Sequence, residues 1–261
     1  MNPLSHVSAP DLAVVVPIYN EAPNIAEVLR EWYACFERVA PNFILFAVND
    51  GSTDETASIL ARLSARFGVR LRIVDKRNGG HGSSCREGYE LALSEKASWI
   101  FQIDSDGQCD PAFFARLYSL RHGNDCVFAY RQTRDDGWSR VAISACCRAL
   151  LWLVTGKTLR DPNVPYRLIS APALRRALRR IPLNFDLQNI ALSLALARDS
   201  SLRWSHCPIH FRARQGGTNS INCGKIVGMG LRLMRDLHRI KTDEDPYSGW
   251  WTRWTRRRLA S

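Results

Sequence analysis

The chain has 261 residues, of which 46% are hydrophobic, so it can bury the core of one full domain. Its 36 Lys and Arg against 25 Asp and Glu give a formal net charge of +11. This charge favours a polyanionic partner such as a phosphate, a nucleic acid or an anionic membrane. No apolar run approaches the roughly 18 residues of a membrane span. Residues 1–10 lack the basic and apolar regions of a secretion signal, so we expect a cytoplasmic protein.

The eight cysteines are scattered, with no CxxC pair and no Cys/His spacing that suits zinc. We expect reduced and mostly buried thiols. The cysteines are Cys35, Cys85, Cys109, Cys126, Cys146, Cys147, Cys207 and Cys223.

The first hundred residues alternate between apolar strands and helices. Buried strands are expected at 12–18, 43–48, 69–74 and 99–103. The helices between them are expected at 25–39, capped by Asn24, at 55–67 and at 83–94. Four strand-then-helix units predict a doubly wound α/β half whose ligand lies beyond the carboxyl ends of the strands.

The regularity loosens after residue 110. We expect a short strand at 126–130, a helix at 138–154, a connection through Asp161-Pro162 and a helix at 187–198. The predicted domain boundaries are an extension at 1–11, one domain at 12–225, divided at residue 110 into a donor half and an acceptor half, and a tail at 226–261. The tail combines an amphipathic helix at 226–240 with a final segment rich in Trp and Arg.

Asp104 and Asp106 follow the strand at 99–103 directly, and Gln108 comes two residues later. In an extended chain alternate side chains point the same way, so the three could converge on one cation. Hard oxygen ligands suit Mg²⁺ or Mn²⁺, with positions left for the oxygens of a diphosphate. Aspartates at a strand end can also be simple turn formers, and this alternative stays open.

Glu21 and Asp50 stand at the ends of the first two strands, where a parallel sheet gathers its ligand contacts. Their carboxylates can accept hydrogen bonds from ribose hydroxyls or from a base N–H. The loop 78–82, Asn-Gly-Gly-His-Gly, is similar to a phosphate-binding loop. It lacks the Lys-Ser/Thr of a P-loop and the dinucleotide spacing, which counts against an ATPase or a dehydrogenase.

Three motifs together resemble family 2 glycosyltransferases of the GT-A fold, and within them the polyprenol-phosphate sugar transferases such as the dolichol-phosphate mannose synthases. The motifs are Val16-Pro17-Ile18-Tyr19-Asn20-Glu21, Val48-Asn49-Asp50-Gly51-Ser52-Thr53-Asp54 and Asp104-Ser105-Asp106-Gly107-Gln108. The resemblance covers roughly residues 12 to 225. It implies a single Rossmann-like α/β domain with a mixed, mainly parallel central sheet flanked by helices.

The resemblance also implies roles for individual residues. The nucleotide-sugar, a UDP- or GDP-sugar, would be held by Pro17, Tyr19, Glu21, Asp50 and Asp104. Asp104, Asp106 and Gln108 would bind Mg²⁺ or Mn²⁺ and the diphosphate, with Asp106 catalytic. The phosphate of a polyprenyl phosphate acceptor would be read by Arg131, Arg140, Ser144 and Arg214. Each arginine could instead be a solvated surface charge.

Two features depart from the family pattern. The segment Arg214-Gln215-Gly216-Gly217-Thr218-Asn219-Ser220 lacks the Ser-Lys ending usual in mannose-phosphate synthases. C-terminal membrane spans, which many relatives carry, are not found in these residues. The Trp- and Arg-rich tail is typical of a peripheral contact at the inner face of a membrane, although a disordered basic tail remains the alternative.

The nature of the acceptor sets the mechanism. The resemblance implies inversion by one in-line displacement. A lipid phosphate is already a dianion at neutral pH and needs no general base, whereas a sugar hydroxyl needs one. Asp186 is the candidate base for a hydroxyl acceptor, and a helix-capping acid is its alternative reading.

Two other function classes stay open from the sequence. A non-catalytic nucleotide-sugar-binding relative is disfavoured by the intact Asp104-Ser105-Asp106. A nucleic-acid-binding protein fits the charge, but no known nucleic-acid-binding signature is present, so we expect no nucleic acid partner. The sequence leaves the oligomeric state open.

Overall fold

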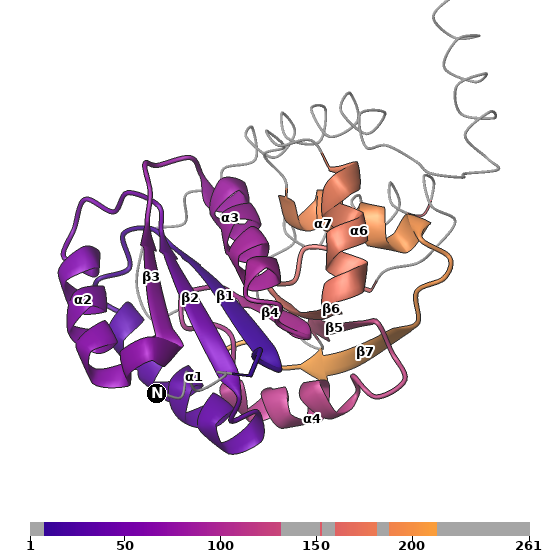
Figure 1. The fold of residues 1–261 in the computed structure, drawn as a ribbon, viewed down its shortest axis with the longest axis horizontal. Coiled ribbons are helices and arrows are strands. Elements are labelled where there is room, and N and C mark those ends of the chain that lie inside the picture. Colours follow the sequence, from indigo (N-terminus) through magenta and orange to yellow (C-terminus); the bar gives the residue numbers. More distant parts are fainter. Residues whose placement is uncertain (1–7, 132–151, 153–159, 182–187, 213–261) are drawn as a thin grey trace, which may run out of the picture.

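The computed structural model describes residues 8–131, 152, 160–181 and 188–212 (Figure 1). The first half contains β1 (Leu12–Ile18), α1 (Ile25–Val39), β2 (Phe43–Asn49), α2 (Thr56–Phe67), β3 (Leu71–Asp75), α3 (His81–Ser94) and β4 (Trp99–Ile103). The second half contains α4 (Phe114–Ser119), β5 (Cys126–Arg131), β6 (Tyr166–Ser170), α6 (Ala171–Arg180), α7 (Gln188–Arg198) and β7 (Trp204–Ile209).

The strands form one sheet of seven in the order β3-β2-β1-β4-β6-β5-β7. Strands β1, β2, β3 and β4 pair in parallel, and β5 pairs in parallel with β7. Strand β6 is antiparallel to both of its neighbours, β4 and β5. The predicted mixed, mainly parallel sheet is therefore confirmed, and β1 to β4 end at one common edge.

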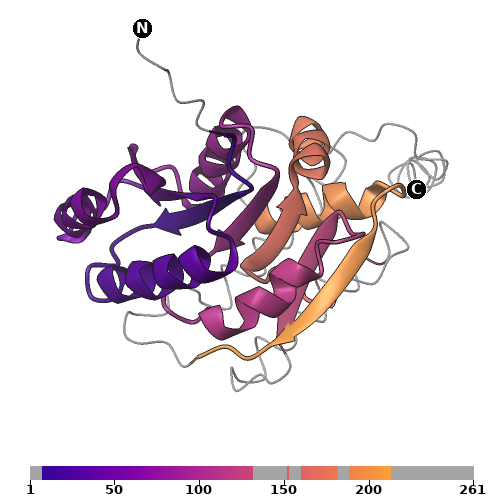
Figure 2. The same cartoon turned by 60° about the horizontal axis from the view of Figure 1, so that its bottom comes forward.

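Helices cover both faces of the sheet, which explains why β1 and β2 are buried at every position. Ala13 and Val15 of β1 pack with α3, α6 and α7, whereas Leu12, Val14 and Val16 pack with α1, α2 and α4. Figure 2 shows α1 and α4 together in front of the sheet. This alternation along one apolar strand is the pattern of a central strand that is covered on both sides.

Most of the predicted strands and helices agree with the structure, with three differences. Strand β3 begins later than expected because Gly68–Arg70 forms a 3₁₀ turn. Asn24 makes no side-chain cap on α1; its amide donates instead to Glu21 Oε2, 3.2 Å away. Elements α4, β6, α6 and β7 are present although the sequence pattern did not predict them.

Several predictions lie outside the described residues, namely the helices at 138–154, apart from Trp152, and at 226–240. Cys35, Cys85, Cys109, Cys126 and Cys207 are buried free thiols, as expected. Among the described residues, no helix is long and apolar enough to cross a membrane.

Candidate active site

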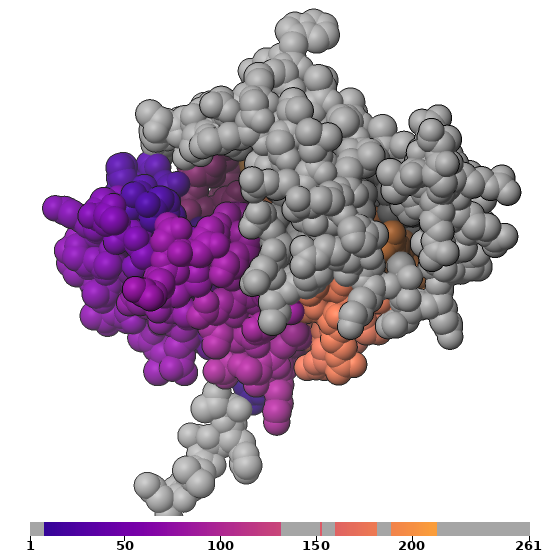
Figure 3. Space-filling view, turned by 90° about the horizontal axis from the view of Figure 1, so that it is seen from above, coloured from indigo at the N-terminus to yellow at the C-terminus, as the bar shows by residue number. Residues whose placement is uncertain are grey.

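A cavity of about 360 Å³ opens at the edge where β1, β2 and β4 end. Figure 3 looks onto this edge of the molecule. Six residues that the sequence singled out line the cavity: Pro17, Tyr19, Glu21, Asp50, Asp104 and Asp106. They come from three separate strand ends, so the sheet brings together what the chain keeps far apart.

The loops after β1 and β2 are bound tightly to each other. Asn20, which has a positive φ of 53°, accepts a hydrogen bond from the Thr53 amide at 2.8 Å. The backbone N–H of Asn20 donates to Ser52 Oγ at 3.0 Å, and the backbone N–H of Glu21 donates to Thr56 Oγ1 at 3.0 Å. These contacts fix the loop that carries Tyr19, a residue that is 48% exposed and lines the cavity.

Asp50 is buried and its carboxylate holds the loop after β3. Oδ1 accepts from Lys76 Nζ at 2.6 Å and from the Gly79 amide at 2.9 Å, and Oδ2 accepts from the Gly80 amide at 2.8 Å. Burial raises the pKa of Asp50, but these hydrogen bonds outweigh it and hold the pKa below its ordinary value. The side chain is therefore a fixed anion at the cavity wall.

Close backbone approach makes this arrangement possible. Gly51 has a φ of +70°, and a Cβ built on it would lie 2.8 Å from the Asn78 amide nitrogen. A residue with a side chain at Gly51 would push the loop after β3 away from Asp50.

The two aspartates after β4 occupy different environments. Asp104 is half-buried and its Oδ1 accepts no hydrogen bond from the described residues; His81 Nε2 lies 3.9 Å from this oxygen. Burial raises the pKa of Asp104, His81 lowers it, and the neighbouring Asp106 raises it further. Asp106 Oδ1 instead accepts from the Gln108 amide at 3.1 Å.

The hydrogen bond from the Gln108 amide to Asp106 shows that the chain after β4 is not extended, contrary to the prediction. Gly107 has a φ of +76°, and the chain turns between Asp106 and Gln108 instead of continuing the strand. Gln108 is not among the residues that line the cavity. Its role as a metal ligand stays a prediction.

The site fits a hard divalent cation. Among the described residues no group of three or more His, Cys, Asp or Glu is arranged to hold a metal ion. Asp104 and Asp106 do supply carboxylate oxygens at one cavity wall, and the buried Asp104 Oδ1 has no hydrogen-bond partner in the part of the chain that the structure describes. Mg²⁺ commonly binds one or two carboxylates together with the phosphates of its substrate, and a carboxylate pair of this kind meets that need.

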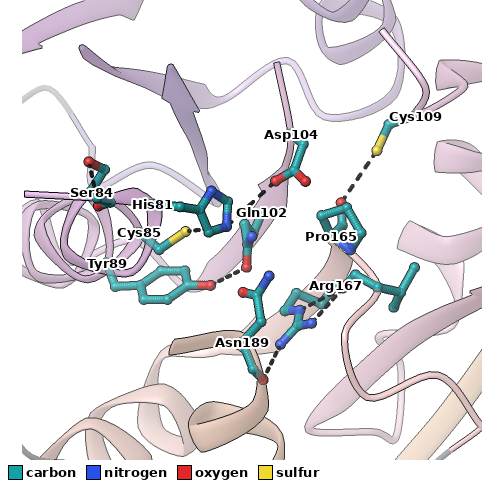
Figure 4. Close-up of polar contacts among 12 residues, drawn as sticks. His81, Ser84, Cys85, Tyr89, Gln102, Asp104, Cys109, Pro165, Arg167 and Asn189 are labelled. Atoms are coloured by element: carbon teal, nitrogen blue, oxygen red, sulfur yellow. Dashed lines mark hydrogen bonds and ion pairs between the residues drawn. The ribbon is translucent and has the colours of Figure 1, made fainter. Parts of the chain in front are cut away.

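A buried polar network lies near Asp104 (Figure 4). Tyr89 donates a short hydrogen bond to Gln102, two residues before Asp104. The fully buried Arg167 donates to the Pro162, Val164 and Asn189 carbonyls and to Ser193 Oγ. Arg167 thereby ties the start of β6 to α7.

Comparison with known proteins identifies the family. The model of the glycosyl transferase family 2 matches residues 13–181. The chain belongs to glycosyl transferase family 2. Two similar curated relatives are the undecaprenyl-phosphate 4-deoxy-4-formamido-L-arabinose transferases of Edwardsiella ictaluri (strain 93-146) and Enterobacter sp. (strain 638). Each is 27% identical over 228 residues, which are 87% of this chain and 66% of the relative.

Solved structures show the GT-A fold of this family 2 member. The glucosyl-3-phosphoglycerate synthase of Mycobacterium tuberculosis, solved with Mn²⁺, UDP and phosphoglyceric acid, has a TM-score of 0.65 at 18% identity. The match covers 90% of this chain and 80% of that one. The mannosyl-3-phosphoglycerate synthase of Rubrobacter xylanophilus has a TM-score of 0.60 at 15% identity, covering 91% of this chain and 78% of that one.

The cavity is also lined by residues to which the sequence pattern assigned no role. Asn78, Gly80, His81 and Ser84 line the cavity, all in or just after the loop before α3. From the sequence, the loop 78–82 is interpreted only as similar to a phosphate-binding loop. His81, whose side chain is 47% exposed, lies 3.4 Å from Cys85 Sγ, and its interactions with Cys85 and then with Asp104 raise its pKa. The glycines of this loop are visible in the sequence. Its contact with Asp50 forms only in the folded protein and could not be predicted from the sequence.

The predicted acceptor residues are only partly described. Arg131 ends β5 and forms a two-bond ion pair with the buried Asp161, Nε to Oδ2 at 2.8 Å and Nη2 to Oδ1 at 3.2 Å. Arg140, Ser144, Asp186 and Arg214 lie outside the described residues. Their roles in this family 2 glycosyltransferase stay predictions.

Proposed function

We propose that this chain is an inverting, metal-dependent glycosyltransferase that moves a sugar from a nucleotide-sugar to a polyprenyl phosphate. One observation carries the proposal: Glu21, Asp50, Asp104 and Asp106 line a single cavity at the strand ends of a family 2 GT-A domain. The chain covers 66% of the length of the curated relatives, so their activity comes to it as a proposal.

The nucleoside would bind at the ends of β1 and β2. Tyr19 offers an exposed ring for a base to stack on, and Glu21 and Asp50 offer carboxylate oxygens. Lys76, Gly79 and Gly80 hold Asp50 in one position, so its free lone pairs have a fixed direction toward the cavity. A UDP- or GDP-sugar is the donor class that such a site fits.

The leaving group would depart beside Asp104 and Asp106. A bound Mg²⁺ or Mn²⁺ would act as a Lewis acid on the departing nucleoside diphosphate. Asp104 and Asp106 would hold this ion, and the turn at Gly107 would keep Asp106 at the cavity wall. Mn²⁺ and UDP are bound together in the structure of the M. tuberculosis relative, which supports a divalent ion here.

The acceptor would be a phosphate monoester, the group that the curated relatives carry in their name. Its second pKa lies near about 6, so the phosphate oxygen attacks as an anion without a general base. A single in-line displacement inverts the anomeric carbon. The net charge of +11 favours an anionic acceptor, and peripheral contact with a membrane would supply it.

Product formation tests the proposal directly. UDP- and GDP-sugars are incubated with Mn²⁺ or Mg²⁺ and a short polyprenyl phosphate, and both the released nucleoside diphosphate and the glycosylated lipid are measured. We expect lipid-linked product that disappears with EDTA. Asp106→Ala should lower kcat by about 100-fold or more, because it removes charge stabilisation at the leaving group. Asp11→Ala, at an exposed aspartate of the opposite edge, is the matched control.

Other outcomes identify the other classes. Full activity of Asp106→Ala would show the metal assignment to be wrong. Donor binding without transfer to any acceptor would indicate a nucleotide-sugar-binding protein. Transfer to a saccharide hydroxyl that collapses in Asp186→Asn would indicate a general-base mechanism. Salt-dependent DNA binding with no binding of nucleoside diphosphate would indicate a nucleic-acid-binding protein.

A further inference from the structure

The carboxyl end of β5 lies at the same edge of the sheet as the carboxyl end of β4, where Asp104 lines the cavity. In the register of the sheet, Arg167 of β6 pairs with Gln102 of β4 on one side and with Phe128 of β5 on the other. Strands β4 and β5 therefore run in the same direction. Asp104 lies two residues beyond Gln102, and Tyr130 lies two residues beyond Phe128. Because one strand, β6, separates β4 from β5, two strand spacings of about 5 Å place Tyr130 roughly 10 Å from Asp104.

The arginine predicted for this position is already engaged. Arg131 forms its two-bond ion pair with Asp161, whose side chain is only 3% exposed, and its guanidinium lies 5.2 Å from the Phe211 ring centroid. Asp161 neutralises Arg131 and orients it. This pair anchors the segment before β6 to the end of β5.

Arg160, the residue before Asp161, differs from Arg131 in its exposure and in its partners. Arg160 is exposed, and its guanidinium lies over the Tyr130 ring, 4.6 Å from the centroid. Within the described residues we find no carboxylate partner for Arg160. Stacking on the half-buried Tyr130 orders a long side chain without using its hydrogen-bond donors, so among the described residues these donors are left to bind an anion.

We propose that Arg160, held over Tyr130, binds the phosphate group of a phosphate monoester acceptor. This inference rests on the proposed function and adds the residue that recognises the acceptor. A guanidinium matches two phosphate oxygens with two parallel hydrogen bonds. The Arg131–Asp161 pair positions Arg160 through the adjacent backbone but does not itself supply the free charge.

The variants separate charge, geometry and fold. Arg160→Gln removes the charge, Arg160→Lys keeps it without the two-bond geometry, and Tyr130→Leu removes the stacking surface. Arg70→Gln is the matched control, because Arg70 also lies over a ring, 5.4 Å from the Phe43 centroid, at the opposite edge of the sheet. Thermal melting of each variant checks the fold.

The measurements are the acceptor KM, the donor Kd and direct binding of three probes by calorimetry. The probes are a short polyprenyl phosphate, the polyprenol without phosphate, and 3-phosphoglycerate. We expect Arg160→Gln to raise the KM and Kd for polyprenyl phosphate about 10- to 100-fold, with donor Kd and polyprenol binding unchanged. Arg160→Lys should recover part of this loss, Tyr130→Leu should show an intermediate loss, and Arg70→Gln should show none.

The arms distinguish the source of the phosphate. Loss of polyprenyl phosphate binding alone assigns the site to the lipid headgroup, and parallel loss of 3-phosphoglycerate binding assigns it to a phosphate monoester of either source. Unchanged binding of both in Arg160→Gln overturns the inference, even if transfer to lipid persists and confirms the proposed function. Conversely, a wild-type protein that glycosylates 3-phosphoglycerate but never the lipid, and loses this in Arg160→Gln, overturns only the lipid assignment.

Discussion

Asp50 combines two tasks in one carboxylate, since it faces the cavity and also holds the loop after β3 through Lys76, Gly79 and Gly80. A charged hydrogen bond in a buried position contributes on the order of 2 kcal/mol, and its removal leaves the Lys76 ammonium without its partner. The loop after β3, which carries Asn78 to the cavity and leads into α3 at His81, therefore depends on the charge of Asp50.

The pH dependence of stability tests this role. The folded pKa of Asp50 lies below its unfolded value of about 3.9, so its contribution is fully present above that value and is lost as the pH falls through the folded pKa. We expect Asp50→Asn to be less stable than the wild type at pH 7. The gap should narrow below about pH 4, as measured by urea unfolding from pH 7 to pH 3. A gap that stays constant with pH would contradict the ionised role of Asp50.

At the scale of elements, α3 packs against β1 more closely than an ordinary helix. A Cβ built on Gly88 would overlap Val15 Cγ1 and crowd Cγ2 and Cβ of the same side chain. Val15 is fully buried in the core cluster between α3, α6 and α7, so it has little room to yield. The absence of a side chain at Gly88 sets the distance from α3 to the sheet, and hence the position of His81 at the cavity.

Gly88→Ala should therefore destabilise the protein by about 1–3 kcal/mol through overpacking. In an open helix position the same change would stabilise by about 1 kcal/mol, so the sign is diagnostic. Thermal or urea unfolding measures the effect. The double variant Gly88→Ala/Val15→Ala supplies the control, because removing the Val15 methyls should recover part of the loss and give a coupling energy between the two sites. Strict additivity would argue against the contact.

The elements that sequence reasoning found and missed have physical reasons. Strand β1 is a continuous apolar run, β2 is apolar up to its last residue, and β4 carries one polar residue, Gln102. Their shared edge follows from parallel pairing, so the cavity residues at their ends could be predicted. Strand β6 was missed because Arg167 interrupts its apolar pattern, yet that arginine is fully buried and satisfied by carbonyls from distant segments. The turn at Gly107 and the capture of the loop after β3 by Asp50 depend on tertiary contacts.

At the scale of the whole molecule, the cavity gathers negative charge in a strongly basic protein. Glu21, Asp50, Asp104 and Asp106 line one cavity, whereas the chain as a whole carries a formal charge of +11. Lys76 forms an ion pair with Asp50 and so neutralises part of this negative charge, but Asp104 Oδ1 accepts no hydrogen bond within the described residues. Like charges held together by a fold oppose its stability until a cation joins them.

Mn²⁺ should therefore stabilise the folded protein itself, apart from any activity. A ligand that binds only the folded state adds about 2.7 kcal/mol at a concentration 100 times its Kd, which for a domain of this size raises Tm by several degrees. We expect such a rise with Mn²⁺ in the wild type and a larger one with Mn²⁺ and UDP together. The rise should be absent in Asp104→Asn/Asp106→Asn and preserved in Asp11→Asn, whose site is at the opposite edge. An equal rise in the double variant would place the ion elsewhere and remove the aspartates after β4 from the metal site.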